Sequence, residues 1–285
     1  MKICFNQATG DHCKDHSMMA DLELAEKYGF DYIDLRFDIL DDYLKEHSVK
    51  ELADWFATHN LKPSSYSALL FFNWKKTKEE EQAVYDEVNR LLPIFEKIGL
   101  QTICCVPSFN IKEHATIPEI IDDCAYMLNK IADLAEPYGI RIALEVIGHQ
   151  AFTVNRWDVA VKIIENVNRE SVGLALDLFH FFAMGSDIKD LRESDGKRVI
   201  NLHINGSENL PKGASYFDDT KRLWPGEGAI DNKAMIDALL ESGFDKETVP
   251  AAIEVFRPEY YELSIEDNIK KSYETTKEFV ERYLS

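Results

Sequence analysis

Four short apolar runs in the C-terminal half of the chain each end in a side chain of a metal-ligating type. In chain order these end residues are Glu145, Asp177, His203 and Glu254. Three carboxylates brought together would repel one another and raise one another's pKa unless a cation lies among them. Carboxylate oxygens with one imidazole suit a divalent ion such as Mn²⁺, Mg²⁺, Co²⁺ or Zn²⁺. The four residues are therefore predicted to bind one divalent metal ion.

The residues two positions earlier in the same runs support this prediction. Side chains two apart on a strand share a face of the sheet. The residues beneath the four polar side chains are Ala143, Ala175, Asn201 and Ala252. Three of them are alanine, and such small side chains leave room for something bound above them.

Further candidates follow the same runs and are predicted to bind substrate. His180 lies three residues after Asp177 and could face the same cavity, although it could also be a core histidine among its neighbouring phenylalanines. Arg257 lies three residues after Glu254 and could hold a substrate oxygen or form a surface ion pair. Trp224 and Glu227 lie in a loop suited to a pocket wall, although the glycines of that loop could serve only its turn.

The elements that must position these residues are eight strand-then-helix units. Short apolar runs typical of buried parallel strands cover residues 2–6, 32–36, 62–68, 102–106, 141–146, 172–177, 199–203 and 249–254. Amphipathic stretches lie between them, and four of these end at Gly29, Gly99, Gly139 and Gly243. Glycine favours the left-handed conformation that closes a helix. Asp231 and Ser264 are predicted to cap the starts of the last two helices.

Eight such units in about 250 residues indicate a (β/α)₈ barrel, an α/β fold in which the carboxyl ends of the strands carry the chemistry. The alternative is an open doubly wound sheet, which normally shows a phosphate-binding glycine pattern after its first strand. Residues 6–11 read Asn-Gln-Ala-Thr-Gly-Asp and lack that pattern. We expect one barrel domain over residues 1–285.

Charge and composition exclude several classes of partner. The 285 residues include 32 basic and 51 acidic side chains, a formal net charge of −19 that disfavours binding to nucleic acid. No apolar run approaches the ~20 residues of a membrane helix, so no membrane partner is expected. The five cysteines show no disulfide spacing, and the first residues show no secretory leader. We expect a cytoplasmic protein, and its oligomeric state stays open.

The chain resembles the xylose-isomerase-like TIM barrels, which include sugar isomerases, epimerases and endonuclease IV. The order Glu145, Asp177, His203, Glu254 matches the metal ligands of that family strand by strand, and Asp177-x-x-His180 is one of its recurrent pieces. Within the family the chain is most similar, end to end, to the inosose isomerases of bacterial inositol catabolism. The strings that carry this similarity are Cys4-Phe5-Asn6, Ala135-Glu136-Pro137-Tyr138-Gly139, Phe179-His180-Phe181, Ala183-Met184-Gly185-Ser186, Trp224-Pro225-Gly226, Gly228-Ala229-Ile230-Asp231 and Phe256-Arg257-Pro258-Glu259-Tyr260-Tyr261.

Differences between this sequence and other family members narrow the activities that we expect. Endonuclease IV needs extra histidines that are missing at residues 35–37, 65–67 and 223–225. The ketohexose 3-epimerases carry a glutamate six residues beyond the first ligand and an arginine six beyond the metal histidine. Those positions are Ala151 and Asn209 here, which weakens the epimerase alternative.

The resemblance implies a metal-dependent isomerase that moves the carbonyl of a keto-inositol or related ketose to the adjacent carbon through an enediolate. It implies that Glu145 and Glu254 are both ligands and the acid/base pair. A substrate with adjacent carbonyl and hydroxyl oxygens could chelate the ion, which would act as a Lewis acid. His180 and Arg257 would hold substrate oxygens. The alternatives are a ketose 3-epimerase, an inosose dehydratase and, least favoured, a non-enzymatic polyol-binding barrel.

Overall fold

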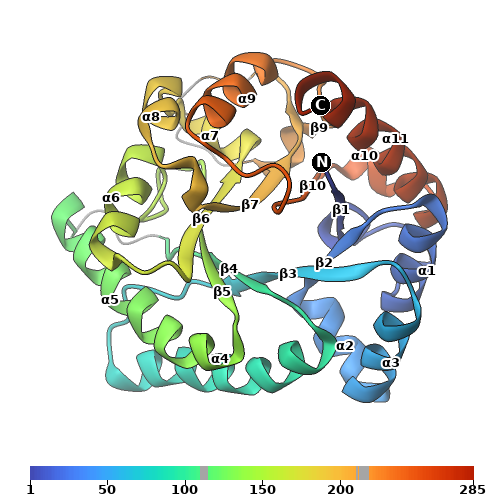
Figure 1. The fold of residues 1–285 in the computed structure, drawn as a ribbon, viewed down its shortest axis with the longest axis horizontal. Coiled ribbons are helices and arrows are strands. Elements are labelled where there is room, and N and C mark those ends of the chain that lie inside the picture. Colours follow the sequence, from blue (N-terminus) through green and yellow to red (C-terminus); the bar gives the residue numbers. More distant parts are fainter. Residues whose placement is uncertain (110–114, 210, 212–217) are drawn as a thin grey trace.

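The structure is a computed structural model that describes residues 1–109, 115–209, 211 and 218–285. Eight parallel strands close into a barrel in the order β1-β10-β7-β6-β5-β4-β3-β2, as predicted (Figure 1). The strands are β1 (Ile3–Asn6), β2 (Tyr32–Arg36), β3 (Lys62–Leu70), β4 (Thr102–Val106), β5 (Arg141–Glu145), β6 (Val172–Asp177), β7 (Val199–Ile204) and β10 (Ala251–Ile253).

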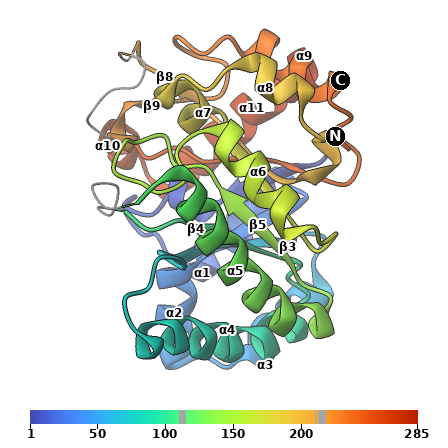
Figure 2. The same cartoon turned by 90° about the vertical axis from the view of Figure 1, so that its left-hand side faces the viewer.

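Helices surround this barrel in both views (Figures 1 and 2). The longer ones are α1 (Met18–Tyr28), α2 (Phe37–Glu46), α3 (Val49–Thr58), α4 (Lys78–Ile98), α5 (Ile117–Ala135), α6 (Trp157–Val167), α9 (Asn232–Glu241) and α11 (Ile265–Tyr283). Three short helices, α7 (Leu178–Met184), α8 (Ile188–Glu193) and α10 (Pro258–Tyr261), accompany them. Their apolar sides and the outward faces of the strands form one continuous core, with Leu22, Leu91 and Ile131 fully buried.

The strand bounds agree closely with those predicted, with two informative differences. The third strand runs two residues further than expected, to Leu70. The last strand is shorter and ends at Ile253, so Glu254 follows the strand instead of ending it. The Glu254 N–H still donates to the Ile204 carbonyl at 3.3 Å, which keeps this residue in register with β7. Its side chain therefore remains at the barrel mouth.

The predicted helix ends are confirmed. Gly29, Gly99, Gly139 and Gly243 all adopt positive φ, between 68° and 98°. The side chain of Asp231 accepts a hydrogen bond from the Ala234 N–H at the start of α9, and Ser264 caps α11 in the same way. None of the helices in the described part of the chain is long and apolar enough to cross a membrane.

One element at the mouth was not predicted. After β7 the chain forms a short antiparallel pair, β8 (Gly206–Ser207) with β9 (Arg222–Leu223). Gly206 and Gly228 allow this hairpin to close, because a Cβ at either position would overlap the backbone opposite it. Gly228 also has φ +82°, which favours glycine. The pairing of β9 with β8 places Arg222 at the barrel mouth, although the two strands are well separated in sequence.

Candidate metal centre

The four side chains predicted as ligands meet at the carboxyl ends of β5, β6, β7 and β10. Each offers one ligand atom, and these atoms all lie within 4.8 Å of one another. All four residues are at most 5% exposed. Elsewhere in residues 1–109, 115–209, 211 and 218–285, no other group of three or more histidine, cysteine or acidic side chains is this close. The structure thus brings the four residues predicted from the sequence together at one point.

The imidazole of His203 faces the carboxylates with its Nδ1 atom. This nitrogen lies 3.1 Å from a Glu145 oxygen and 3.2 Å from a Glu254 oxygen. The Oδ2 atom of Asp177 lies 3.8 Å from the same nitrogen. Three carboxylate oxygens and one ring nitrogen around one point form a donor set that fits a hard or borderline divalent ion. A fourfold protein set also leaves positions for substrate oxygens.

The charges of this cluster are unbalanced in the metal-free protein. Burial raises the pKa of Glu145, and His203 only partly offsets that effect. Burial acts in the same direction on Glu254, but His203 and Arg222 hold its pKa well below the ordinary range. The carboxylates in turn raise the pKa of His203 well above its usual value, against the effect of burial. Without metal, the His203 proton therefore supplies part of the positive charge that a divalent ion would bring.

Asp177 connects the cluster to its surroundings through both oxygens. Its Oδ1 accepts the His180 N–H at 2.8 Å and so caps helix α7. Its Oδ2 accepts hydrogen bonds from Asn205 at 2.9 Å and from Arg222 at 2.6 Å. The carboxylate is thereby fixed in orientation before any ligand binds.

Arg222 is the functional candidate that sequence reasoning missed. It is fully buried and also lies 3.4 Å from Glu254 and 3.1 Å from Asp219. Its guanidinium lies over the rings of Phe179 and Phe256 at 4.7 and 5.2 Å from their centroids. The position six residues beyond the metal histidine holds Asn209, whereas Arg222 lies further along the chain, at the start of β9. The spacing Asp219-x-x-Arg222 was the only available signal.

A cavity of about 300 Å³ opens directly above this cluster. Its wall is more apolar than polar and contains Ala8, Arg36, Phe37, Ser67, Ala68, Leu70, Phe71, Val106, Glu145, Ile147, Phe152, His180, Asp219, Arg222, Glu254 and Phe256. The predicted residue His180 is therefore part of the wall. Arg222 lies 3.1 Å from its Nε2 atom. Because a guanidinium can only donate, Nε2 must be the acceptor and the ring proton lies on Nδ1. Burial lowers the His180 pKa to about 4, which keeps the ring neutral.

The other three predicted substrate contacts lie outside the described cavity wall. Arg257 donates to Glu208 at 2.8 Å and to the Arg222 carbonyl at 3.3 Å, and so supports the hairpin. Trp224 is buried and stacks on Tyr260, with ring centroids 4.1 Å apart. Glu227 is exposed, and its backbone N–H closes the turn onto the Trp224 carbonyl. The glycine-containing loop thus builds the turn that carries Arg222.

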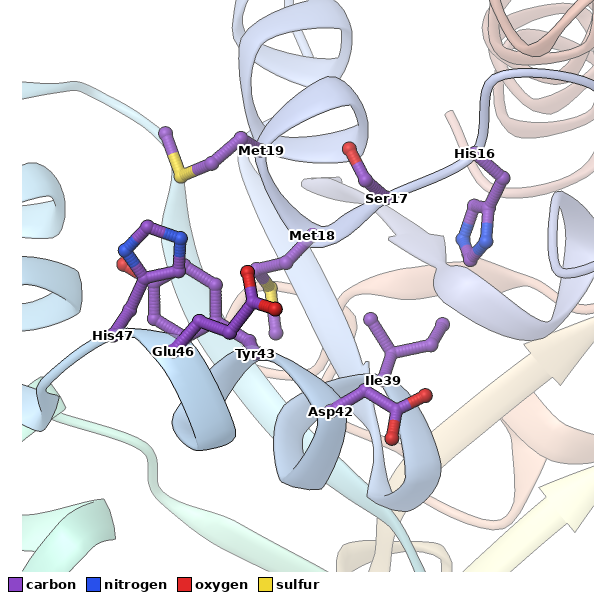
Figure 3. A pocket seen from close by; sticks show the side chains of 9 residues that line it. All are labelled: His16, Ser17, Met18, Met19, Ile39, Asp42, Tyr43, Glu46 and His47. Atoms are coloured by element: carbon purple, nitrogen blue, oxygen red, sulfur yellow. The ribbon is translucent and has the colours of Figure 1, made fainter.

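A second, larger cavity of about 420 Å³ lies away from the barrel mouth, between α1 and α2 (Figure 3). Met18 and Met19 extend into it from α1, opposite Tyr43 and Glu46 of α2 (Figure 3). It contains no group of clustered ligand atoms among the described residues. We therefore assign the chemistry to the cavity at the mouth, where the cation site and the polar wall coincide.

Comparisons with known proteins agree with this geometry. The family model for the xylose isomerase-like TIM barrel matches residues 22–279. The inosose isomerase of Bacillus velezensis is 41% identical over 285 residues, covering 100% of this chain and 99% of that protein. The inosose isomerase of Bacillus subtilis is 41% identical over 286 residues and covers 100% of both. The crystal structure of the IolI protein with a bound zinc atom superposes with a TM-score of 0.94 at 41% identity, covering 100% of both chains.

Proposed function

This chain belongs to the xylose isomerase-like TIM barrel family, and we propose that it is an inosose isomerase. The observation that carries the proposal is its 41% identity to inosose isomerases along the full length of both chains. The substrate is then a cyclic polyol ketone, and the reaction moves its carbonyl to the adjacent ring carbon. A cavity of about 300 Å³ lined by charged and aromatic side chains suits a single six-membered polyol ring.

Glu145, Asp177, His203 and Glu254 would hold one divalent ion. The donor set supports Zn²⁺ or Mn²⁺, and the zinc in the related IolI structure favours zinc. When bound, the ion would act as a Lewis acid toward the carbonyl oxygen. The residues of the chain do the remaining work, which is to orient the ring, exclude water and move protons.

Glu145 and Glu254 would act as the acid/base pair. One carboxylate removes the proton from the hydroxyl-bearing carbon next to the carbonyl, and the pair of electrons left behind forms the carbon–carbon double bond of an enediolate. Return of a proton to the former carbonyl carbon completes the transfer, while the hydroxyl proton passes to the former carbonyl oxygen. The net reaction conserves all atoms and electrons. Both carboxylates are buried at the mouth and line the cavity, where they can reach a bound substrate.

His180 and Arg222 would bind the substrate oxygens. Neutral His180 can donate a hydrogen bond without competing for the proton of the reaction, and Arg222 is a fixed cation at the same wall. We assign Arg257, Trp224 and Glu227 to the support of the hairpin. All five cysteines are free and buried, which supports a location in the reducing cytoplasm.

Incubation with 2-keto-myo-inositol in deuterated water, followed by NMR, tests the function. We expect a second inosose that keeps all heavy atoms of the substrate and carries deuterium at one ring carbon. Activity should be lost with chelator and return with added Zn²⁺ or Mn²⁺. A dione with new ultraviolet absorbance would indicate a dehydratase, and inversion at a carbon with the carbonyl unmoved would indicate an epimerase.

The role of Glu254 is tested separately by Glu254→Gln. Loss of the base should abolish exchange of the substrate α-proton with solvent, whereas the exposed control Glu278→Gln should exchange it at the normal rate. Normal exchange in Glu254→Gln would rule out its assignment as the base.

A further inference from the structure

Asp34 is an aspartate in the interior of the barrel, on β2, for which the proposed mechanism has no use. It is fully buried, and its Oδ1 atom accepts the Ser65 N–H at 3.0 Å. Its Oδ2 atom has no hydrogen-bond partner among the residues that the structure describes. The thiol of Cys4 lies beside this carboxylate, and a thiol is only a weak donor. A buried carboxylate oxygen without a partner costs stability, so its presence calls for a physical reason.

The ring nitrogen donor that the structure brings near this oxygen is the imidazole of His203. The Asp34 Oδ2 atom lies 3.9 Å from the His203 Nε2 atom. This is the ring nitrogen that points away from the metal cluster, because Nδ1 faces Glu145 and Glu254. A small rotation of either side chain would bring the two atoms to hydrogen-bond distance.

A neutral imidazole that offers Nδ1 to a cation must carry its proton on Nε2, and that proton needs an acceptor. The other neighbour of Nε2 is the Asn201 side-chain NH₂ group, 3.2 Å away. That group also faces the Ser65 hydroxyl at 3.4 Å. In this amide orientation the NH₂ group donates and does not accept, so the Asp34 oxygen is the acceptor that remains once Nε2 carries the proton.

We propose that Asp34 is a positioning residue that accepts the Nε2 proton of His203 and so holds the ring with Nδ1 free for the metal. Histidines that bind metals commonly donate their second N–H to a carboxylate in this way, and losing that partner weakens metal binding by about 10- to 100-fold. The proposal rests on the metal site of the proposed function. It gives a physical reason for a fully buried carboxylate with one unpartnered oxygen on β2.

Zinc affinity of Asp34→Asn, measured by competition with a chromophoric chelator, tests the proposal. We expect the dissociation constant to rise by about 10- to 100-fold. Asp21→Asn is the matched control, because Asp21 is also fully buried with one unpartnered oxygen but lies on α1, where it bonds His16 and Gln7. The control should bind Zn²⁺ as tightly as the wild type.

NMR of the Zn²⁺-loaded wild type gives a readout that does not depend on a variant folding. The His203 Nε2 proton should exchange slowly and resonate far downfield, as expected for a hydrogen bond to a carboxylate, and should move upfield in Asp34→Asn. Unchanged affinity in Asp34→Asn, or a loss confined to Asn201→Ala, would overturn the role of Asp34 and leave the metal site intact. Failure of the wild type to bind a divalent ion would overturn both.

Discussion

Arg222 gives the centre its electrostatic balance at the scale of single residues. Three carboxylate ligands and a divalent ion leave one negative charge, and the buried guanidinium beside Asp177 and Glu254 counters it while also pairing with Asp219. A cation beside the ligands helps to stabilise negative charge that develops on a substrate oxygen. The same cation orients His180 through its Nε2 atom.

Replacing this cation should separate catalysis from metal binding. In Arg222→Met we expect kcat/KM to fall by about 100-fold or more, because a donor at the reacting oxygens is lost. Zinc affinity should rise, since a repulsive charge near the ion is removed. Steady-state kinetics and chelator competition measure the two effects. Arg222→Lys, which keeps the charge, should show a smaller increase in affinity; a fall in affinity in both variants would mean that Arg222 is only structural.

His180 makes a prediction about pH. Its folded pKa of about 4 lies below its ordinary 6.5, so the unfolded chain binds this proton more readily. The stability that neutral His180 contributes is complete above about pH 6.5 and is lost as the pH falls toward 4. The free energy of unfolding can be measured with urea, in the presence of chelator, at about pH 7 and about pH 5. The decrease from the higher to the lower pH should be about 2 kcal/mol smaller in His180→Gln than in the wild type. Equal losses in both proteins would contradict a depressed pKa.

The β8–β9 hairpin is the element that completes the site. Without it, Arg222 would lie in a loop before α9, and the metal cluster would face solvent on that side. The hairpin depends on close backbone approach at Gly206 and Gly228 and on the contact of Arg257 with the Arg222 carbonyl. Its glycines therefore serve the site indirectly, by allowing the chain to return to the barrel mouth.

Two glycines with similar φ test this role. Gly228→Ala places a methyl group against the Ser207 backbone at φ +82°, whereas Gly243→Ala, at φ +92°, meets nothing within 4 Å. The control should cost only the left-handed conformation, about 1 to 2 kcal/mol, and keep full activity. Gly228→Ala should cost more and lower kcat/KM, because Arg222 is displaced. Thermal unfolding and kinetics report both effects, and normal activity in Gly228→Ala would separate the hairpin from catalysis.

At the scale of the whole molecule, we expect stability to depend on a bound divalent ion. The barrel brings three carboxylates into one buried cluster, which is repulsive until a cation binds. A ligand that binds only the folded chain stabilises it by about 2.7 kcal/mol at a concentration 100 times its dissociation constant. In the metal-free protein, the contribution of His203 to stability depends on pH. His203 has a raised pKa there, so its contribution is present at low pH and is lost as the pH rises through the raised value.

The increase in Tm on adding Zn²⁺ should therefore be larger at about pH 8 than at about pH 6, since zinc must displace the His203 proton at the lower pH. Calorimetry with Zn²⁺ or with chelator at both pH values measures this difference. An increase in Tm that is independent of pH would mean that His203 does not exchange its proton for the metal.

Local patterns in the sequence were sufficient for the barrel and the four clustered ligand candidates. Strand periodicity, helix-stop glycines and the polar residues at strand ends act over a few residues, and parallel strands of a barrel necessarily bring their carboxyl ends together. Glu145, Asp177, His203 and Glu254 could be predicted for that reason, even though β10 ends one residue early.

The tertiary structure alone decided the surroundings of that cluster. Arg222 reaches the mouth through a hairpin whose register depends on backbone contacts distant in sequence, and Asp34 approaches His203 from the far side of the barrel. Neither approach leaves a periodic or short-range signal, so nearby Arg257 was the natural sequence choice for the cation. The net charge of −19 shows a similar division: composition disfavoured polyanionic partners, but the cation that pairs with Asp177 and Glu254 appeared only in the folded chain. Spacing determines a strand end, whereas desolvation and long-range packing determine which charges meet there.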